Sequence, residues 1–487
     1  PEYTNDTLTI DDSREGWVNS VHMVLDGFFF GAKVPKFDYS DIRPEGAPIN
    51  GFGGTSSGHG PLKELHENLT KLYSAKIGEP ISSVDIVDTE NLIGRCVVAG
   101  NVRRSAALAM GTHDDFDYLQ MKNDAEKLMH HRWGSNNSFN AVVGMDYTWH
   151  AEQSQNNGEP GYIWLNNART KGRFKDGTRL DDVNVAGFNP CVEQQLEDAE
   201  LCCLVETFPA KHEDYEDYLK TLKIAYLYGK TITLSNTHWP ETNAKMLKNR
   251  RIGLSQSGVV QAFNKHGRRE MYNWCDNAYQ HVQELDEEYS NWLCIPKSVR
   301  MTSIKPSGTV SLLNGSTPGI HFPEDEYYIR RIRFSKDSAL VSPLKDAGYH
   351  VEDDEYSPNT VCVEFPIHEP YFEKGKSEVS IWEQLEIAAQ YQYYWADNSV
   401  SITVTFKDEE ATQIKSALEM YESRLKAVSF LRYKTTGYVQ PPYEPISKER
   451  YNELIKNVTP IQRFEVEEEG GSGTKFCDGE SCEIEFN

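Results

Sequence analysis

The chain has few cysteines, a shortage of basic residues and no long hydrophobic run, and each shortage excludes a class of protein. Nine cysteines in 487 residues are too few for a fold held together by disulfides. Asp and Glu number 74 against 50 Lys and Arg, and the net charge of -24 argues against a protein that binds nucleic-acid backbones. No apolar run approaches the roughly 18 residues of a membrane helix, and no stretch has the pattern of a signal peptide. We therefore expect a cytoplasmic protein with no nucleic-acid or membrane partner.

The rest of the composition is that of a folded globular chain. Hydrophobic residues make up 38% of the sequence and aromatic residues 11%, which is enough for a large core. Helices are expected over residues 11–30, capped by Asp12 or Ser13, and over 114–132. Short apolar runs predict strands at 96–99 and 231–234. This alternation of helices and strands indicates an α/β architecture.

Two glycine-rich segments have backbone N–H groups that can wrap an anion. Residues 41–62 form the first, for which a plain surface loop is the alternative. Residues 301–322 form the second, where a strand-like entry leads into a Pro-Ser-Gly-Thr turn with two hydroxyls. This turn matches neither the P-loop nor the dinucleotide fingerprint, but its chemistry suits a phosphate. The predicted phosphate seat comprises Pro306, Ser307, Gly308 and Thr309.

Two further polar segments are candidates for ligand binding. One has two arginines on a glycine-flanked loop, which suits phosphate or base recognition, although a solvated charge pair is equally compatible. The other is an Asn-Asn-Ser run, rich in donors and acceptors as a polar site or a turn would be. The segments comprise Gly100, Asn101, Arg103 and Arg104, and Asn136, Asn137 and Ser138.

Residues 187–206 carry the densest chemistry in the chain. If the backbone at 189–193 is extended, Asn189, Cys191 and Glu193 point to one side, because strand side chains alternate. A Cys–Glu pair without a nearby His suits a hydrolase poorly, since the carboxylate raises the thiol pKa. It is better suited to one-electron chemistry, in which a sulfur radical takes a hydrogen atom and the carboxylate takes a proton.

Other thiols are available to supply reducing equivalents. Cys202 and Cys203 follow in the same stretch, with ordinary buried cysteines as the alternative interpretation. Cys477 and Cys482 lie beyond an acidic, Gly-Gly-Ser-Gly tether, and a mobile pair suits thiol–disulfide exchange. One pair cannot supply the four ligands of a structural zinc site, so a metal role would need further ligands, and an incidental pair is the third alternative. No metal site is predicted.

Taken together, the motifs resemble a ribonucleotide reductase catalytic subunit, and more specifically an adenosylcobalamin-dependent (class II) one. They stand in the family's order over nearly the whole chain. The matching segments are IRPEGAPINGFGGTSSG, CVVAGNVRRSA, HRWGSNNS, NGEPGYIWLNNA, NPCVEQQL, NRRIGLSQSG, KPSGTVSLL, STPGIHF and YYIRRIR, followed by the terminal cysteine pair. The resemblance implies a ten-stranded α/β barrel that reduces ribonucleotides to 2'-deoxyribonucleotides, with adenosylcobalamin as cofactor and a nucleoside triphosphate as allosteric effector.

The resemblance also implies roles for single residues. Cys191 would carry the thiyl radical that abstracts the ribose 3'-hydrogen, and Glu193 would be the base on the 3'-hydroxyl. Asn189 would orient the ribose, and Cys202 would be a reducing cysteine. The Pro306–Thr309 turn would hold substrate phosphates, and Asn136, Asn137 and Ser138 would also bind the substrate. The Arg103–Arg104 loop would couple the effector to base choice. The terminal cysteine pair would re-reduce the site and then be reduced by thioredoxin or a similar reductant.

The chain departs from the family pattern near its beginning. The family's partner of Cys202 lies on an early barrel strand, upstream of the IRPEGAPI-type segment. Cys96 stands in the segment that resembles the effector loop and is not expected to be that partner. We therefore expect a barrel over residues 1–445 that lacks its first strands, a helical extension over 446–463 and a flexible redox tail over 464–487. A separate N-terminal polypeptide that completes the barrel is a candidate partner, in keeping with a chain that starts at Pro1.

The radical source is the second departure. Reductases with a separate metal subunit carry an adjacent tyrosine pair on the last barrel strand, where this chain has Ser429 and Phe430. This favours a cobalamin cofactor bound next to Cys191. The alternatives are a class I-like subunit with a metal partner and a non-catalytic nucleotide-binding fragment. A glycyl-radical enzyme would need a C-terminal glycyl loop in place of the dithiol. The substrate is expected to be a ribonucleoside di- or triphosphate.

Overall fold

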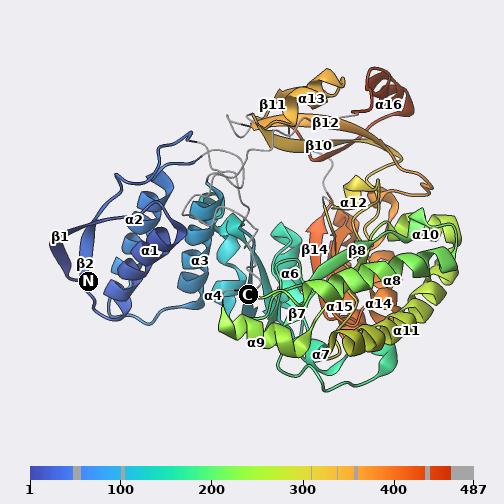
Figure 1. Cartoon of the computed structure of the whole chain (residues 1–487), viewed down its shortest axis with the longest axis horizontal. Coiled ribbons are helices and arrows are strands. Elements are labelled where there is room, and N and C mark those ends of the chain that lie inside the picture. The colour runs from blue at the N-terminus through green and yellow to red at the C-terminus, as the bar shows by residue number, and fades with distance from the viewer. Residues whose placement is uncertain are drawn as a thin grey trace.

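The computed structural model describes residues 1–47, 56–99, 105–237, 239–308, 310–336, 338–355, 360–433 and 439–461. These residues form a large α/β body, an N-terminal lobe beside it and a small four-stranded sheet above it (Figure 1). No helix within those ranges is both long and apolar enough to cross a bilayer.

A five-stranded sheet runs through the body in the order β13-β14-β5-β4-β3. β3, β4 and β5 are parallel to one another, and so are β13 and β14. The two groups meet in antiparallel orientation where β5 pairs with β14. The strands are β3 (Ala107–Thr112), β4 (Ser135–Asn140), β5 (Gly161–Ile163), β13 (Thr403–Phe406) and β14 (Ala427–Arg432).

The row of strands continues beyond β13 through isolated bridges. Ile304 pairs in parallel with Val400, just before β13, and Thr302 pairs in parallel with Leu254 of β9 (Gly253–Gln256). β9 in turn is parallel to β8 (Leu204–Thr207). The predicted α/β class is confirmed, whereas a closed ten-stranded barrel is not seen in the described part of the chain.

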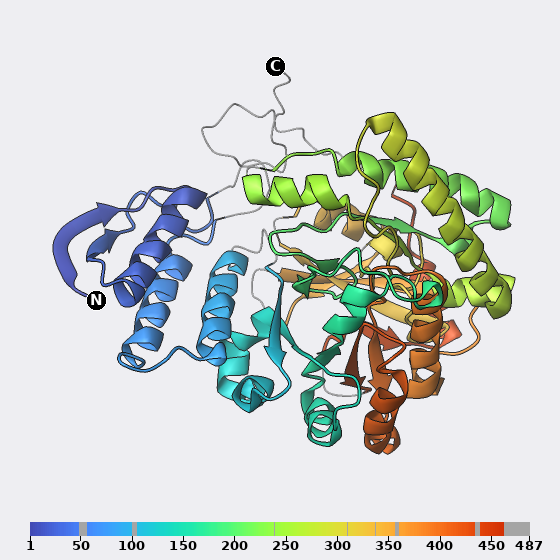
Figure 2. The same cartoon turned by 90° about the horizontal axis from the view of Figure 1, so that it is seen from below.

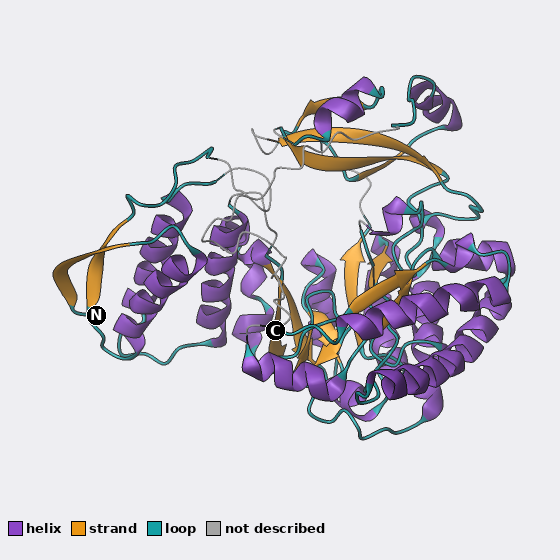
Figure 3. Ribbon diagram, viewed as in Figure 1, coloured by secondary structure: helices purple, strands orange, loops and turns teal. Residues whose placement is uncertain are grey.

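Helices surround these strands (Figure 3). In the longest, α11, the buried residues Trp274, Ala278, Leu285 and Tyr289 recur on one face, as expected for an amphipathic helix packed on a core. They join the buried residues of the strands in one hydrophobic cluster. The helices of the body are α4 (Phe116–Leu119), α5 (Ala125–His130), α6 (Thr148–Asn157), α7 (Leu165–Thr170), α8 (Tyr215–Ile232), α9 (Pro240–Asn249), α10 (Val259–His266), α11 (Arg268–Leu293), α12 (Val310–Leu313), α14 (Ile381–Tyr394) and α15 (Ile414–Tyr421).

The N-terminal lobe has its own hydrophobic cluster and lies beside the body, with α3 nearest to it (Figure 2). Its first helix is capped by Ser13, whose side chain accepts a hydrogen bond from Gly16 N, as one of the two predicted caps. The lobe comprises β1 (Tyr3–Thr9), α1 (Arg14–Phe29), β2 (Val34–Asp38), α2 (Gly60–Ser74) and α3 (Ser83–Val98).

The upper sheet is antiparallel, in the order β11-β12-β10-β15. The basic YYIRRIR segment is β10, and its charges are paired: Arg331 lies 2.6 Å from Glu364, and Arg333 lies 2.7 Å from Asp354. The elements here are β10 (Tyr327–Ser335), α13 (Val341–Asp346), β11 (His350–Asp353), β12 (Thr360–His368), β15 (Tyr443–Pro445) and α16 (Lys448–Ile455).

Both strands predicted from short apolar runs are wrong. Residues 96–99 form the end of α3, because the capping box of Ser82 and Asp85 starts a helix whose buried face extends to Cys96. Residues 231–234 are the last residues of α8 and the turn after it. In each case a run of β-branched residues continues a helix that was started and packed upstream, so tertiary context overrides local propensity.

The single helix predicted over residues 114–132 is also wrong. Asp115 caps α4 and Asp124 caps α5, each by accepting a hydrogen bond from the backbone three residues on. Aspartate side chains compete for backbone N–H groups in this way, which ends one helical segment and starts the next.

Candidate active site

Cys191 lies in the loop of a tight hairpin between β6 (Gly187–Phe188) and β7 (Gln195–Leu196). The loop is not extended, which corrects the predicted backbone at 189–193. Val192 N donates to Asn189 O at 2.8 Å, and Val192 has a left-handed φ of 65°. The turn nevertheless brings two predicted partners together, because Asn189 Nδ2 donates to Glu193 Oε1 at 2.7 Å.

Glu193 is fully buried and asymmetrically bonded. Its Oε1 accepts from Asn189 and also from Lys305 Nζ at 2.7 Å. Its Oε2 has no hydrogen-bond partner among the described residues. A buried carboxylate oxygen without a donor is costly, so this atom is available to a group that the chain itself does not provide.

Two thiols share the electrostatic surroundings of this carboxylate. Desolvation raises the pKa of Cys191, and the charge of Glu193 raises it further, while Lys305 acts in the opposite direction. The pKa of Cys202 is raised by the same two causes, lowered by the same lysine, and influenced by Cys191 itself. Both cysteines are exposed residues. The hairpin loop and Cys202 therefore form one cluster.

The neighbouring Cys203 is in a different environment. It is buried, its Sγ lies 3.4 Å from Gly229 O, and desolvation raises the pKa of its thiol to about 11. A buried thiol of this kind is a packing residue rather than a reactive one.

Cys191 also lines a cavity of about 360 Å³, whose lining residues do not include Glu193, Lys305 or Cys202. Its volume falls within the roughly 300–1,000 Å³ of small-molecule sites. The wall contains the predicted Asn136, Asn137 and Ser138, which lie in strand β4 and not in a turn. The other lining residues include Gly158, Gly161, Tyr162, Pro306, residues 401–403 and residues 427–431 of β14.

The predicted phosphate seat is only partly described. Pro306 lines the cavity, and Gly308 is exposed. Ser307 is buried, where its hydroxyl accepts from Ser311 N at 3.1 Å and bonds to Glu206. Desolvation raises the pKa of Glu206. Thr309, the loop residues Gly100, Asn101, Arg103 and Arg104, most of the first glycine-rich segment, and Cys477 and Cys482 lie outside the described residues.

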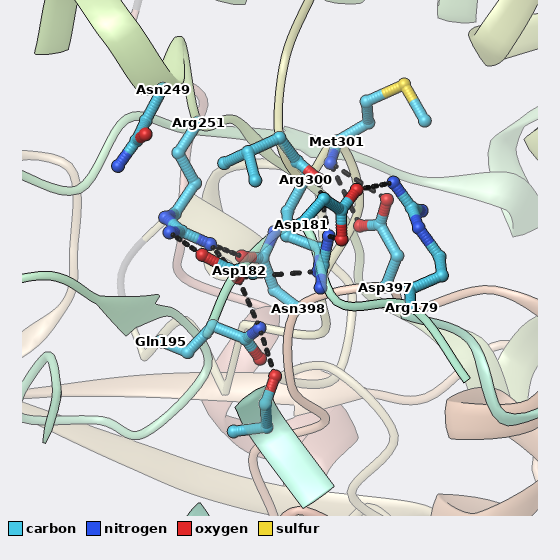
Figure 4. Close-up of polar contacts among 12 residues, drawn as sticks. Arg179, Asp181, Asp182, Gln195, Asn249, Arg251, Arg300, Met301, Asp397 and Asn398 are labelled. Carbon is cyan, nitrogen blue, oxygen red and sulfur yellow. Dashed lines mark hydrogen bonds and ion pairs between the residues drawn. The ribbon is translucent and has the colours of Figure 1, made fainter. Parts of the chain in front are cut away.

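A buried polar network holds the base of the hairpin (Figure 4). Asp182 accepts from two nitrogens of Arg251, at 2.8 and 2.7 Å, and from Gln195 Nε2 at 2.7 Å. Arg251 also donates to Glu200 at 3.0 Å. The side chains of Asp182, Arg251 and Glu200 are completely buried. The hairpin is therefore anchored by charges that have no access to water.

Lys426 connects this network to the sheet. Its Nζ donates to Gln195 Oε1 at 3.1 Å and to the backbone oxygens of Asp397 and Asn398 at 2.7 Å each. Burial lowers its pKa well below the usual value. The Asp397 carboxylate accepts from Met301 N at 2.9 Å, so the segment that leads to Lys305 is held by the same contacts.

The sequence interpretation missed Lys305, Gln195 and Lys426. Lys305 had a signal, since it stands directly before the Pro-Ser-Gly-Thr turn in the KPSGTVSLL motif. Gln195 also had one, since it stands in the NPCVEQQL motif. Lys426 had none, because its partner Gln195 lies far away in the sequence.

Comparisons with known proteins agree with this arrangement. The sequence model of the B12-dependent ribonucleotide reductase insertion domain matches residues 3–73, which make up much of the N-terminal lobe. The adenosylcobalamin-dependent ribonucleoside-triphosphate reductase of Euglena gracilis is 45% identical over 496 residues, covering 99% of this chain and 68% of its own length. The chain belongs to this reductase family. The predicted resemblance is thereby confirmed.

Two further relatives of this reductase family match almost as much of the chain. The probable adenosylcobalamin-dependent ribonucleoside-triphosphate reductase of Dictyostelium discoideum is 50% identical over 98% of this chain and 64% of its own length. A crystal structure of a B-12 dependent (class II) ribonucleotide reductase superposes with a TM-score of 0.84 and 37% identity, over 94% of this chain and 68% of that one. The chain thus spans about two thirds of the length of these relatives.

The cavity of about 360 Å³ is too small for a whole corrin ring but has room for the adenosyl group of the cofactor that the family's name implies. Its walls carry small and hydroxyl side chains, including Ser138, Thr403 and Ser429, with room for a nucleoside-sized group next to Cys191. Gly158 has a positive φ of 85°, and a Cβ there would lie 2.8 Å from Phe430 O, so glycine permits this wall to close on β14. Asn137 Nδ2, a buried donor without a partner in the described residues, is available to a bound molecule.

We predict that Asp182→Asn lowers the free energy of unfolding by about 3–5 kcal/mol, because it leaves the buried Arg251 without its closest countercharge. Urea denaturation followed by tryptophan fluorescence measures the loss. Glu287→Gln is the matched control, since its pair with Lys297 is 3.1 Å long but exposed, and it is expected to cost less than about 1 kcal/mol. Equal losses in the two variants would contradict the anchoring role.

Proposed function

We propose that the chain forms the catalytic part of an enzyme that reduces ribonucleotides to 2'-deoxyribonucleotides. The observation that carries the proposal is the position of Cys191, which lines a cavity and also belongs to the cluster of Glu193, Lys305 and Cys202. A thiol between two such environments is able to receive an oxidising equivalent from one side and act on a substrate on the other. The names of the relatives favour a ribonucleoside triphosphate as the substrate.

The chain's residues, together with a cysteine partner for Cys202, supply a balanced reaction. The Cys191 thiyl radical takes the hydrogen atom from ribose C3' and becomes a thiol, while Glu193 Oε2 takes the proton of the 3'-hydroxyl. The 2'-hydroxyl leaves as water, and two electrons and two protons come from the dithiol of Cys202 and its partner, which becomes a disulfide. The hydrogen atom then returns from Cys191 to C3', which regenerates the radical, and Glu193 returns its proton to the 3'-oxygen. Asn189 holds Glu193 and orients the ribose.

Adenosylcobalamin, when bound, would supply the oxidising equivalent that converts the Cys191 thiol to the radical. The cavity residues Thr403 and Ser429 would lie beside its adenosyl group. β14 supports this assignment, because Ser429 and Phe430 occupy the positions where a reductase with a separate metal subunit would carry its tyrosine relay.

Regulation and re-reduction are assigned to segments beyond the described residues. The loop with Gly100, Asn101, Arg103 and Arg104, which follows α3 in the sequence, would bind a nucleoside triphosphate effector. Cys477 and Cys482, in a redox tail over 464–487, would re-reduce the disulfide and be reduced by thioredoxin or a similar protein. Asn136, Asn137, Ser138, Pro306, Ser307, Gly308 and Thr309 form the proposed substrate site.

The unpaired edges of the sheet favour the proposal that further strands, from a second polypeptide or from another segment of the same protein, complete it. Within the described residues, β3 and β8 each pair on one side only, at the two ends of the row of strands. Strands that pair with both would close a ten-stranded barrel and would bring the cysteine partner of Cys202. An unpaired edge is a ready template for such an addition.

Replacing Cys191 by Ser is expected to reduce turnover by at least about 10³-fold, because a hydroxyl does not form the radical that the thiol forms. Nucleotide binding should be unchanged. Deoxyribonucleotide product is quantified by chromatography and binding by calorimetry, in the intact protein. Cys294→Ser, an exposed cysteine after α11, is the control and should retain full activity. Persistent turnover in the Cys191 variant would refute the mechanism.

Turnover is also expected to require adenosylcobalamin under anaerobic conditions. Hydroxocobalamin, which lacks the adenosyl group, should not replace it, because the cavity beside Cys191 must receive that group. Product formation is measured with each compound and with iron or manganese added alone. A requirement for a metal-containing subunit in place of cobalamin would favour the class I-like alternative.

Co-purification tests the open edges of the sheet. A tagged form of this chain, isolated from its native cells, is expected to recover a polypeptide that supplies the missing strands and a cysteine, unless both already precede this segment in one protein. Mass spectrometry of the purified material distinguishes these two arrangements. Full turnover by residues 1–487 alone would show that neither is needed.

A further inference from the structure

Lys305 is the one cation in direct contact with Glu193 in the described part of the chain. Its Nζ is 2.7 Å from Glu193 Oε1, and its side chain is 28% exposed while that of Glu193 is 0% exposed. Asn189 Nδ2 reaches the same oxygen at 2.7 Å. Both donors therefore converge on Oε1, and neither is directed at Oε2.

The backbone of Lys305 is as firmly held as its side chain. Lys305 N donates to Ser255 Oγ at 2.7 Å, and Ser255 lies in the fully buried strand β9. Ile304, the preceding residue, is completely buried and pairs with Val400, and Pro306 follows. The ammonium is thus presented from a backbone that has little freedom to move.

We propose that Lys305 is a positioning residue that clamps Glu193 through Oε1 and reserves Oε2 for the proton of the substrate hydroxyl. The inference rests on the proposed function for the identity of that hydroxyl. A carboxylate that rotates freely presents either oxygen, whereas one with two donors on Oε1 presents a single basic atom in one orientation. Fixing a catalytic base in this way avoids the loss of rate that follows a small misplacement.

The same ammonium is the charge partner of the two thiols. The titratable groups around it are Cys191 and Glu193 of the hairpin, Cys202 just before β8, and Glu206 of β8. Desolvation acts to lower the pKa of Lys305, but the attraction of Glu193 outweighs it and raises that pKa, so the side chain stays charged. Each cysteine thiolate therefore forms next to a permanent cation.

The variant Lys305→Ala tests whether Lys305 positions Glu193 for catalysis or only stabilises the fold. We expect kcat to fall about 100-fold with KM little changed, since the base is misplaced and the substrate still binds. Ethylammonium should restore activity by entering the space of the missing side chain, while tetramethylammonium at equal concentration, which has no N–H donor, should not. Lys374→Ala is the matched control, because Lys374 pairs with Glu383 at 2.6 Å and is 35% exposed, outside the site.

Thiol alkylation gives a readout that is independent of turnover. In Lys305→Ala the thiolates of Cys191 and Cys202 lose their cation, their pKa values rise further, and alkylation by iodoacetamide at pH 8 should slow about threefold or more. Peptide mass spectrometry measures both rates against Cys294, an exposed internal reference.

The outcomes distinguish the two hypotheses. An inactive wild-type protein with the missing strands and cysteine, cofactor and reductant all present would overturn the proposed function, and the alkylation rates would still test the lysine. Unchanged alkylation would place the ammonium away from the thiols and overturn the present inference. So would a kcat of Lys305→Ala within about threefold of wild type, or a loss of activity that ethylammonium and tetramethylammonium restore equally.

Discussion

The buried pairing of Asp182 with Arg251 is the constraint on which the hairpin depends. Two charges without water are stable only if each finds its partner, and a missing partner costs several kcal/mol. Gln195 and Glu200 complete the hydrogen bonds of this pair, and Lys426 continues them to β14. A one-residue slip of β7 would take Gln195 away from Asp182 and Lys426, so these contacts favour a single register. Such a network fixes the position of the hairpin more than it adds to the stability of the fold.

The loop of the hairpin, like its base, has a buried carboxylate held by a cation and an amide side chain. The network holds the backbone on either side of Cys191, and Lys305 with Asn189 holds the carboxylate inside the loop. Buried carboxylates are therefore paired with cations in two places: Asp182 with Arg251 at the base of the hairpin, and Glu193 with Lys305 at its loop. Between the two lies a thiol whose surroundings disfavour its ionised form. This suits a cysteine that exchanges hydrogen atoms and does not act as an anionic nucleophile.

The motifs predicted the α/β class and the grouping of Asn189 with Glu193, because those residues are neighbours in the chain. Predictions from local sequence were wrong where tertiary contacts determine the backbone conformation. Cys96 lies in a helix packed on α2 and not in a strand, and the left-handed Val192 places residues 189–193 in a turn and not in an extended segment. Lys426 was unpredictable for the same reason, since its partner Gln195 is on another element of the fold. The ten-stranded barrel came from family resemblance alone, and the described strands include only part of such a closed sheet.

The antiparallel seam between β5 and β14 has a consequence for how the protein folds. Ala427 pairs with Ile163, so the cavity beside Cys191 exists only after segments from distant parts of the chain have met. Contacts of such long sequence separation are slow to form, because the entropy of the intervening loop is lost before they contribute. During synthesis, the hairpin emerges long before Lys426 and β14. The thiol of Cys191 thus acquires this part of its surroundings late, when β14 docks.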